Sequence, residues 1–116
     1  MSPELASKLD KTIKDMHTTR PTVLMATYAV LLGQLADLDD VIIGSPFLGR
    51  TEECFSHTVG HFANPLPIRF TLTPGKRFLR LVEETRDRML DALDHQDMPL
   101  MRLVDTLNPP RVSSHM

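Results

Sequence analysis

The sequence predicts a mixed α/β (α+β) fold in which a sheet of few strands is packed with helices. Two segments have the pattern of strands and four have helical periodicity. One of those helices, over about residues 21–36, is apolar on nearly every side. A stable sheet normally has three or more strands, and a helix without a polar face is expected to be surrounded by protein. The sequence therefore favours part of a larger domain over a complete small domain with an unrecognised third strand.

Capping and spacing predict the first two helices. Ser2 can cap a helix whose first turn holds Pro3 and Glu4. The apolar face of this helix is expected to carry Leu5, Leu9, Ile13 and Met16. Residues 18–21 (Thr-Thr-Arg-Pro) end it and open the second helix. The second helix is apolar at Val23, Leu24, Met25, Ala26, Tyr28, Ala29, Val30, Leu31, Leu32 and Leu35.

A first strand is expected after an acidic turn at residues 37–40. Residues 41–44 (Val-Ile-Ile-Gly) form a short β-branched run. Such a run is typical of a strand covered on both faces. We expect Pro46 and Gly49 to end it.

A second strand is expected after a loop or short helix at residues 51–58. Apolar and other residues alternate from 66 to 73, the period of a half-buried strand. Because Pro67 has no N–H group, this strand either begins there or runs along an edge of the sheet.

A long amphipathic helix is expected over about residues 77–94, after a turn at Pro74-Gly75. Arg80 and Glu84, and likewise Glu84 and Arg88, are four residues apart and can form ion pairs on its outer face.

A last, short helix is expected over residues 99–107. Asp97 is well placed to cap its first turn, and residues 108–110 (Asn-Pro-Pro) stop it. The residues that this helix is expected to bury are Leu100, Leu103, Val104 and Leu107.

Composition excludes several classes of function. The net charge is −2 and basic residues are spread among acidic ones, so neither nucleic acid nor an anionic membrane is expected as a partner. Cys54 is the single cysteine, which favours a reducing compartment. The first residues do not resemble a secretory signal, and the apolar stretch at 23–36 is shorter than a membrane span. We expect a cytoplasmic protein.

Four stretches resemble motifs of the condensation domains of nonribosomal peptide synthetases, in the same order and at similar spacing. They are VIIGSP at 41–46 with Gly49-Arg50 after it, VGHFANPLPIR at 59–69, HQDMP at 95–99, and LNPPRVSSH at 107–115. The residues of the second and fourth stretches are most similar to those in condensation domains of fungal polyketide–peptide hybrid synthases.

The resemblance implies a chloramphenicol-acetyltransferase-like fold with two similar halves and a tunnel between them. Residues 1–116 are then a single partial domain from the C-terminal half, with a leading helix at 1–20 and a motif-bearing region at 21–116. In such domains, acyl and amine substrates enter on phosphopantetheine arms of carrier domains, and the amine attacks the thioester. The catalytic motif, His-His-x-x-x-Asp-Gly, lies in the N-terminal half, and no His-His pair occurs in this chain.

The resemblance also implies the partners. We expect no directly bound cofactor and no catalytic residue in this chain. Expected partners are the N-terminal half of a condensation domain or neighbouring synthase domains, acyl or peptidyl carrier proteins with their phosphopantetheine, and a second copy of the chain.

Nine residues are candidates for the tunnel wall or an interface. By family likeness the segment 60–64 reaches the other half and lines the tunnel floor. Arg50 either reaches a carboxylate of that half or is a solvated loop arginine. For residues 95–97 we favour capping and packing over acid–base work. The nine candidates are Gly49, Arg50, Gly60, Phe62, Asn64, His95, Gln96, Asp97 and Arg111.

Some residues depart from the family pattern. His61 replaces an aromatic residue, Pro65 replaces threonine, and Leu100-Met101 replaces Phe-Glu. These departures put strict preservation of the tunnel in doubt. Cys54, His57 and His61 do not convince as a zinc site, because Gly60 weakens a helix there and no fourth ligand is evident.

Two hypotheses about function remain. In the first, the chain is part of an acyl-transferring, amide-forming condensation domain and works only when joined to the histidine-bearing half. In the second, it is a truncated, non-catalytic remnant that serves as a structural or docking element for a neighbouring synthase domain.

Overall fold

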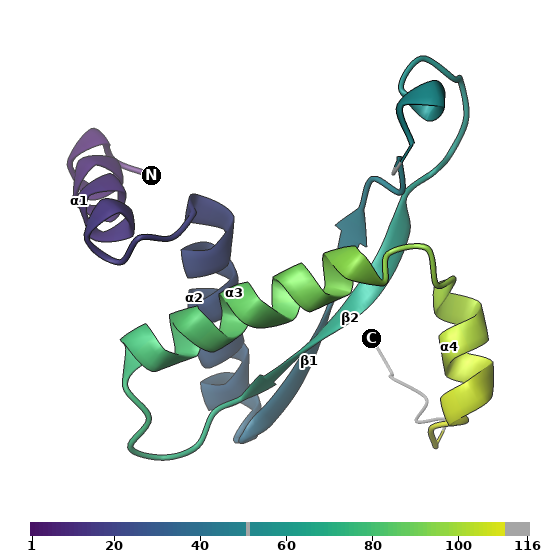
Figure 1. Ribbon diagram of the computed structural model, residues 1–116. Helices are drawn as coiled ribbons and strands as arrows, with labels where there is room; N and C mark the ends of the chain where they lie inside the picture. Colours follow the sequence, from purple (N-terminus) through teal and green to yellow (C-terminus); the bar gives the residue numbers. More distant parts are fainter. Residues whose placement is uncertain (51, 111–116) are drawn as a thin grey trace.

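The computed structural model describes residues 1–50 and 52–110, and its elements follow the predicted order (Figure 1). The elements are α1 (Pro3–Asp15), α2 (Arg20–Ala36), β1 (Asp40–Phe47), the short 3-10 helix η1 (Glu53–Phe55), β2 (Asn64–Thr71), α3 (Phe78–Asp94) and α4 (Leu100–Leu107). Among these residues no helix is long and apolar enough to cross a membrane.

Helix α1 begins as the sequence predicts. The Ser2 hydroxyl accepts a hydrogen bond from the Leu5 N–H group at 3.2 Å, which satisfies one of the free donors of the first turn. No residue of α1 is fully buried. Leu9, Ile13 and Met16 nevertheless pack at the margin of the core.

Helix α2 is covered on one face only. Val23, Ala26 and Ala29 are buried in the core, where the small alanines permit close approach of neighbouring elements. The opposite face exposes four large apolar side chains, although the sequence predicts a helix surrounded by protein. They are Leu24 (43% exposed), Tyr28 (49%), Leu31 (50%) and Leu35 (76%).

Strands β1 and β2 pair antiparallel, from Asp40 opposite Thr71 to Phe47 opposite Asn64. Both α2 and α3 contribute to the core cluster formed by one face of this sheet. The sheet residues in that cluster are Phe47, Leu66, Ile68 and Phe70. The alternation predicted for β2 is therefore confirmed. The prediction that β1 is covered on both faces is wrong within the described chain, because Ile42 on the other face is 66% exposed.

The prolines lie within the strands, and β1 ends at Phe47, between the predicted stops at Pro46 and Gly49. The Leu72 N–H group donates to the Asp39 carbonyl at 2.7 Å. Hydrogen-bonded and non-hydrogen-bonded pairs alternate along an antiparallel ladder. The opposed Pro46 and Pro65 therefore form a non-hydrogen-bonded pair, as does Pro67 with its partner. No ladder bond is lost between the strands, and β2 begins before Pro67.

Helix α3 lies across the sheet and next to α2 (Figure 1), and it buries Leu81, Val82 and Thr85. The predicted ion pair between Arg80 and Glu84 is present at 3.3 Å. The second pair predicted for Glu84 is replaced: Lys76, from the turn before α3, lies 2.8 Å from this carboxylate in place of Arg88.

Helix α4 differs most from its prediction, because none of its residues is buried. Leu100 and Leu103 are half-buried, whereas Leu107 is 68% exposed. The helix lies beside β2 (Figure 1) and has no described neighbour on its outer side.

Candidate functional site

Arg50 organises the loop that joins the end of β1 to the start of β2. Its Nη1 atom donates to the carbonyl oxygens of Phe55 and, at 2.9 Å, Thr58. Its Nη2 atom donates to the Gly60 carbonyl at 3.4 Å. The guanidinium carbon lies 4.2 Å from the centre of the Phe62 ring, a cation–π arrangement. Neither of the two alternatives predicted for Arg50 included these contacts with its own loop.

Gly49 is required where the loop leaves β1. Its φ of +67° is in the left-handed region, which side chains disfavour. A Cβ atom at this position would lie 2.0 Å from the Phe62 carbonyl oxygen. The structure thus brings four candidate residues together in one loop: Gly49, Arg50, Gly60 and Phe62. Contact of Arg50 with a carboxylate of another half stays a prediction.

Phe55 belongs to the same loop and is not among the candidates predicted from the sequence. Its ring centre lies 5.4 Å from that of Phe62, so the two rings and the Arg50 guanidinium form one small cluster. No motif in the sequence signals this contact, because it forms only when the loop brings residues 55 and 62 together.

Asn64, the first residue of β2, binds the connection between α3 and α4. Its Nδ2 atom donates to the carbonyl oxygens of Gln96 at 3.2 Å and Met98 at 2.6 Å. Its Oδ1 atom accepts from the Leu100 N–H group at 3.3 Å. This last bond caps α4. The prediction that Asp97 is the cap is wrong, because Asn64 reaches the free N–H group from a neighbouring strand.

His95 and Gln96 bind carbonyl groups at the end of α3, whereas the capping predicted for residues 95–97 concerned the first turn of α4. The His95 Nδ1 atom lies 2.8 Å from the Asp91 carbonyl oxygen, and the Gln96 amide donates to the Leu93 carbonyl at 3.0 Å. Asp97 is exposed in the same turn. Arg111, the last candidate, lies outside the described residues.

The described candidates therefore form two groups at one end of the sheet, where β1 ends and β2 begins. The loop group is held by Arg50 and the turn group by Asn64, and residues 62–64 connect them along the chain. Within the described ranges no three metal-binding side chains gather.

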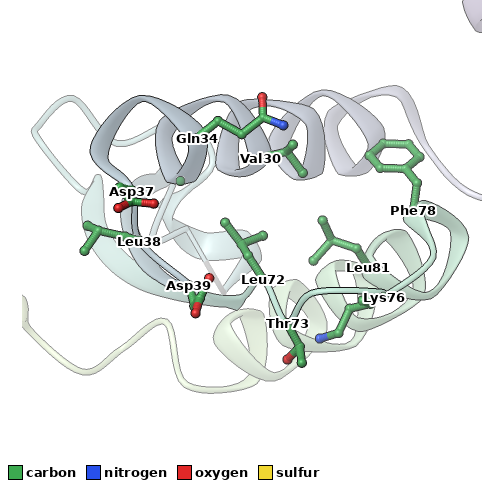
Figure 2. Close-up of a pocket in the computed structure, with 11 residues that line it drawn as sticks. Val30, Gln34, Asp37, Leu38, Asp39, Leu72, Thr73, Lys76, Phe78 and Leu81 are labelled. Atoms are coloured by element: carbon green, nitrogen blue, oxygen red, sulfur yellow. The ribbon is translucent and has the colours of Figure 1, made fainter.

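A separate cavity of about 380 Å³ lies at the other end of the sheet (Figure 2). Its walls come from the end of α2 and the turn between β2 and α3, and none of the described candidates lines it. Lys76 stands at this cavity and also donates to the Glu84 carboxylate at 2.8 Å. That hydrogen bond holds the pKa of Glu84 below its ordinary value.

Comparison with known proteins identifies the family. The sequence matches the family model for the condensation domain over residues 1–116. It is 40% identical over 111 residues to tyrocidine synthase 2 of Brevibacillus parabrevis, covering 96% of this chain and 3% of that protein. It is 32% identical over 112 residues to the hybrid PKS-NRPS synthetase opdA of Penicillium oxalicum, covering 97% of this chain and 3% of that protein.

A solved structure agrees with these matches. The condensation domain from the Monacolin K polyketide synthase superposes with a TM-score of 0.86 at 28% identity, over 95% of this chain and 25% of that domain chain. The present chain thus spans about a quarter of a solved condensation domain and a few per cent of its curated relatives. Because the family match extends over all residues, the chain belongs to the condensation-domain family of nonribosomal peptide synthetases and has part of the chloramphenicol-acetyltransferase-like fold.

Proposed function

We propose that this chain is the part of a condensation domain that supplies scaffold and one wall of the substrate tunnel. The complete domain joins carrier-bound acyl and amine substrates by acyl transfer and amide formation. The histidine-bearing half carries the chemistry, and carrier proteins deliver both substrates on phosphopantetheine arms. The candidate residues around Arg50 and Asn64 face the tunnel or the contact with that half.

The exposed apolar face of α2 is the observation that carries this proposal. Leu24, Tyr28, Leu31 and Leu35 repeat at intervals of four, three and four residues, so they form one continuous stripe. An exposed apolar stripe of this kind marks a surface that another protein element covers. The remainder of a condensation domain is an occupant that accounts for both the stripe and the motifs.

A complementation experiment tests the proposal. This chain is mixed with a second fragment that holds the rest of a condensation domain, including His-His-x-x-x-Asp-Gly, and with carriers loaded with an acyl group and an amine. Mass spectrometry of the carriers should detect the amide only when both fragments are present. Leu31→Glu should abolish product, because it places a charge in the apolar stripe. Leu90→Glu, on the exposed surface of α3, is the matched control and should retain product.

The alternative is a truncated, non-catalytic remnant that acts as a structural or docking element, which would also use the exposed stripe of α2. The same mixture separates the two functions. If the fragments associate stably but form no amide, the result would support the docking function. It would contradict the proposal that the chain is the scaffold of an active tunnel. A chain that binds neither the fragment nor the carriers would contradict both.

A further inference from the structure

Helix α4 has few means of holding its position. It has eight residues, none of them fully buried. A helix of this length is not stable by itself in water. Contacts outside the helix must therefore keep it folded and in place. The half-buried Leu103 lines a groove of about 390 Å³ together with residues of β2 and α3.

Asn64 is the polar anchor of this helix. Its three hydrogen bonds reach two carbonyl groups of the preceding turn and the first N–H group of α4. An asparagine amide can donate two bonds and accept two, so most of this capacity is directed at one short segment. The other described side-chain bonds of the turn, from His95 and Gln96, go back to α3 and hold nothing against β2.

We propose that Asn64 is a positioning residue that fastens residues 95–99 and α4 to β2 as one unit. When its bonds open, α4 separates from the sheet while the core remains folded. The groove between β2, α3 and α4 then loses its outer wall, which includes Met98 and Leu103. This proposal concerns the fold of the chain and does not depend on the proposed function.

Hydrogen exchange measured by NMR on the full chain tests this coupling. The reporters for α4 are the amides of Leu103 and Asn108, which donate to Pro99 and Val104. Those for the core are Ile43 and Phe70, in hydrogen-bonded pairs of the ladder. Asn64→Ala should accelerate exchange in α4 about ten-fold, the scale of a lost helix cap, and leave the core amides within about two-fold of their original rates.

The variant Asn64→Asp distinguishes fastening of the turn and α4 to β2 from capping of α4 alone. Aspartate is among the best helix caps, so it preserves the bond to the Leu100 N–H group, but its carboxylate cannot donate to the two carbonyls. The proposal expects Asn64→Asp to accelerate α4 exchange as Asn64→Ala does. Gln96→Ala, which removes only a bond to Leu93, should change nothing in α4. The proposal would be overturned if α4 amides of Asn64→Asp exchanged at the wild-type rate. It would also be overturned if Asn64→Ala accelerated exchange equally in α4 and in the core.

Discussion

Arg50 adds side-chain hydrogen bonds to the backbone of its loop. The carbonyl groups of Phe55, Thr58 and Gly60 converge on its guanidinium. Guanidinium suits this position because its planar set of N–H donors serves several acceptors at once and its face stacks on the Phe62 ring. One side chain thus connects three points of the loop backbone.

Arg50→Lys should loosen this loop without unfolding the core. Lysine keeps the charge but lacks the planar fork, so we expect a loss of about 1 kcal/mol in loop stability, which corresponds to a roughly five-fold larger open population. Chymotrypsin cleavage after Phe55 should accelerate by a similar factor. Arg102→Lys on the exposed surface of α4 is the control. Unchanged cleavage in Arg50→Lys would show that the loop is held by other contacts.

Glu84 gives the chain a pH dependence. The hydrogen bond from Lys76 lowers its pKa in the folded state, so ionised Glu84 stabilises the fold above the ordinary glutamate value of about 4.3. This stabilisation is lost as the pH falls below that value through the lower folded pKa. Glu84→Gln should reduce the free energy of unfolding by up to about 1 kcal/mol at pH 6, and the difference should shrink toward pH 3.

Urea unfolding at both pH values measures this difference. Glu83→Gln is the matched control, because Glu83 lies next in the sequence, is more exposed and has Arg80 at 3.6 Å as its ion partner. A difference between wild type and Glu84→Gln that stays constant from pH 6 to pH 3 would contradict the assignment to this ion pair.

The sequence predicted residues better than their contacts. A motif indicates Gly49 and Arg50, yet no pattern in the sequence shows which carbonyls Arg50 binds. Capping rules consider only neighbouring residues and therefore indicate Asp97 as the cap of α4. The observed cap, Asn64, is 36 residues away in the sequence, and only strand register brings it to the helix.

At the scale of elements, periodicity predicted the helices and strands within a few residues of their observed ends. The helix predicted over about 77–94 is α3 (Phe78–Asp94), and that over 21–36 is α2 (Arg20–Ala36). The sequence does not show why Pro46 and Pro67 are tolerated inside the strands, because a proline is tolerated according to the hydrogen-bonding phase of the pair that contains it. That phase is a property of two strands together.

Gly33 sets how closely α2 approaches the sheet. A Cβ atom at this position would lie 2.2 Å from Leu72 Cδ1 and 2.9 Å from the Leu38 carbonyl oxygen. Alanine favours a helix by about 1 kcal/mol over glycine, but overpacking typically costs about 1–3 kcal/mol. The backbone contact cannot be relieved by a side-chain rotation, so Gly33→Ala should lower the free energy of unfolding by about 1 kcal/mol.

Urea denaturation compares Gly33→Ala with Gly44→Ala. Gly44 is in β1, where a Cβ atom would have no neighbour within 4 Å, so its substitution should be neutral or slightly stabilising. Equal stability of the two variants would mean that α2 shifts at little cost and that Gly33 does not fix the approach.

The whole molecule has more surface and a larger radius than a self-contained domain of its size. Its accessible surface is 9143 Å², whereas a compact protein of this mass has about 6,400 Å². Its radius of gyration is 16.4 Å, whereas about 13 Å is typical for this length. The sequence indicated this incompleteness through two strands and an apolar helix, but not which face of α2 would remain exposed.

The exposed stripe on α2 should make the isolated chain self-associate. Burying Leu31 and Leu35 between two copies removes apolar surface from water, and each fully buried leucine contributes about 1.5–3 kcal/mol. Sedimentation velocity at increasing concentration should show species larger than 13.1 kDa. The double variant Leu31→Glu and Leu35→Glu should remain monomeric with an unchanged far-ultraviolet circular dichroism spectrum.

The control for self-association is Val59→Glu, because Val59 is 99% exposed in the loop and lies outside the stripe. This variant should associate like the wild type if α2 is the contact. If Val59→Glu alone abolishes association, the loop held by Arg50 is the surface that joins the copies. A wild-type chain that stays monomeric at all concentrations would mean that the stripe is too small or too curved to pair with itself, and that only a surface shaped like the rest of the domain covers it.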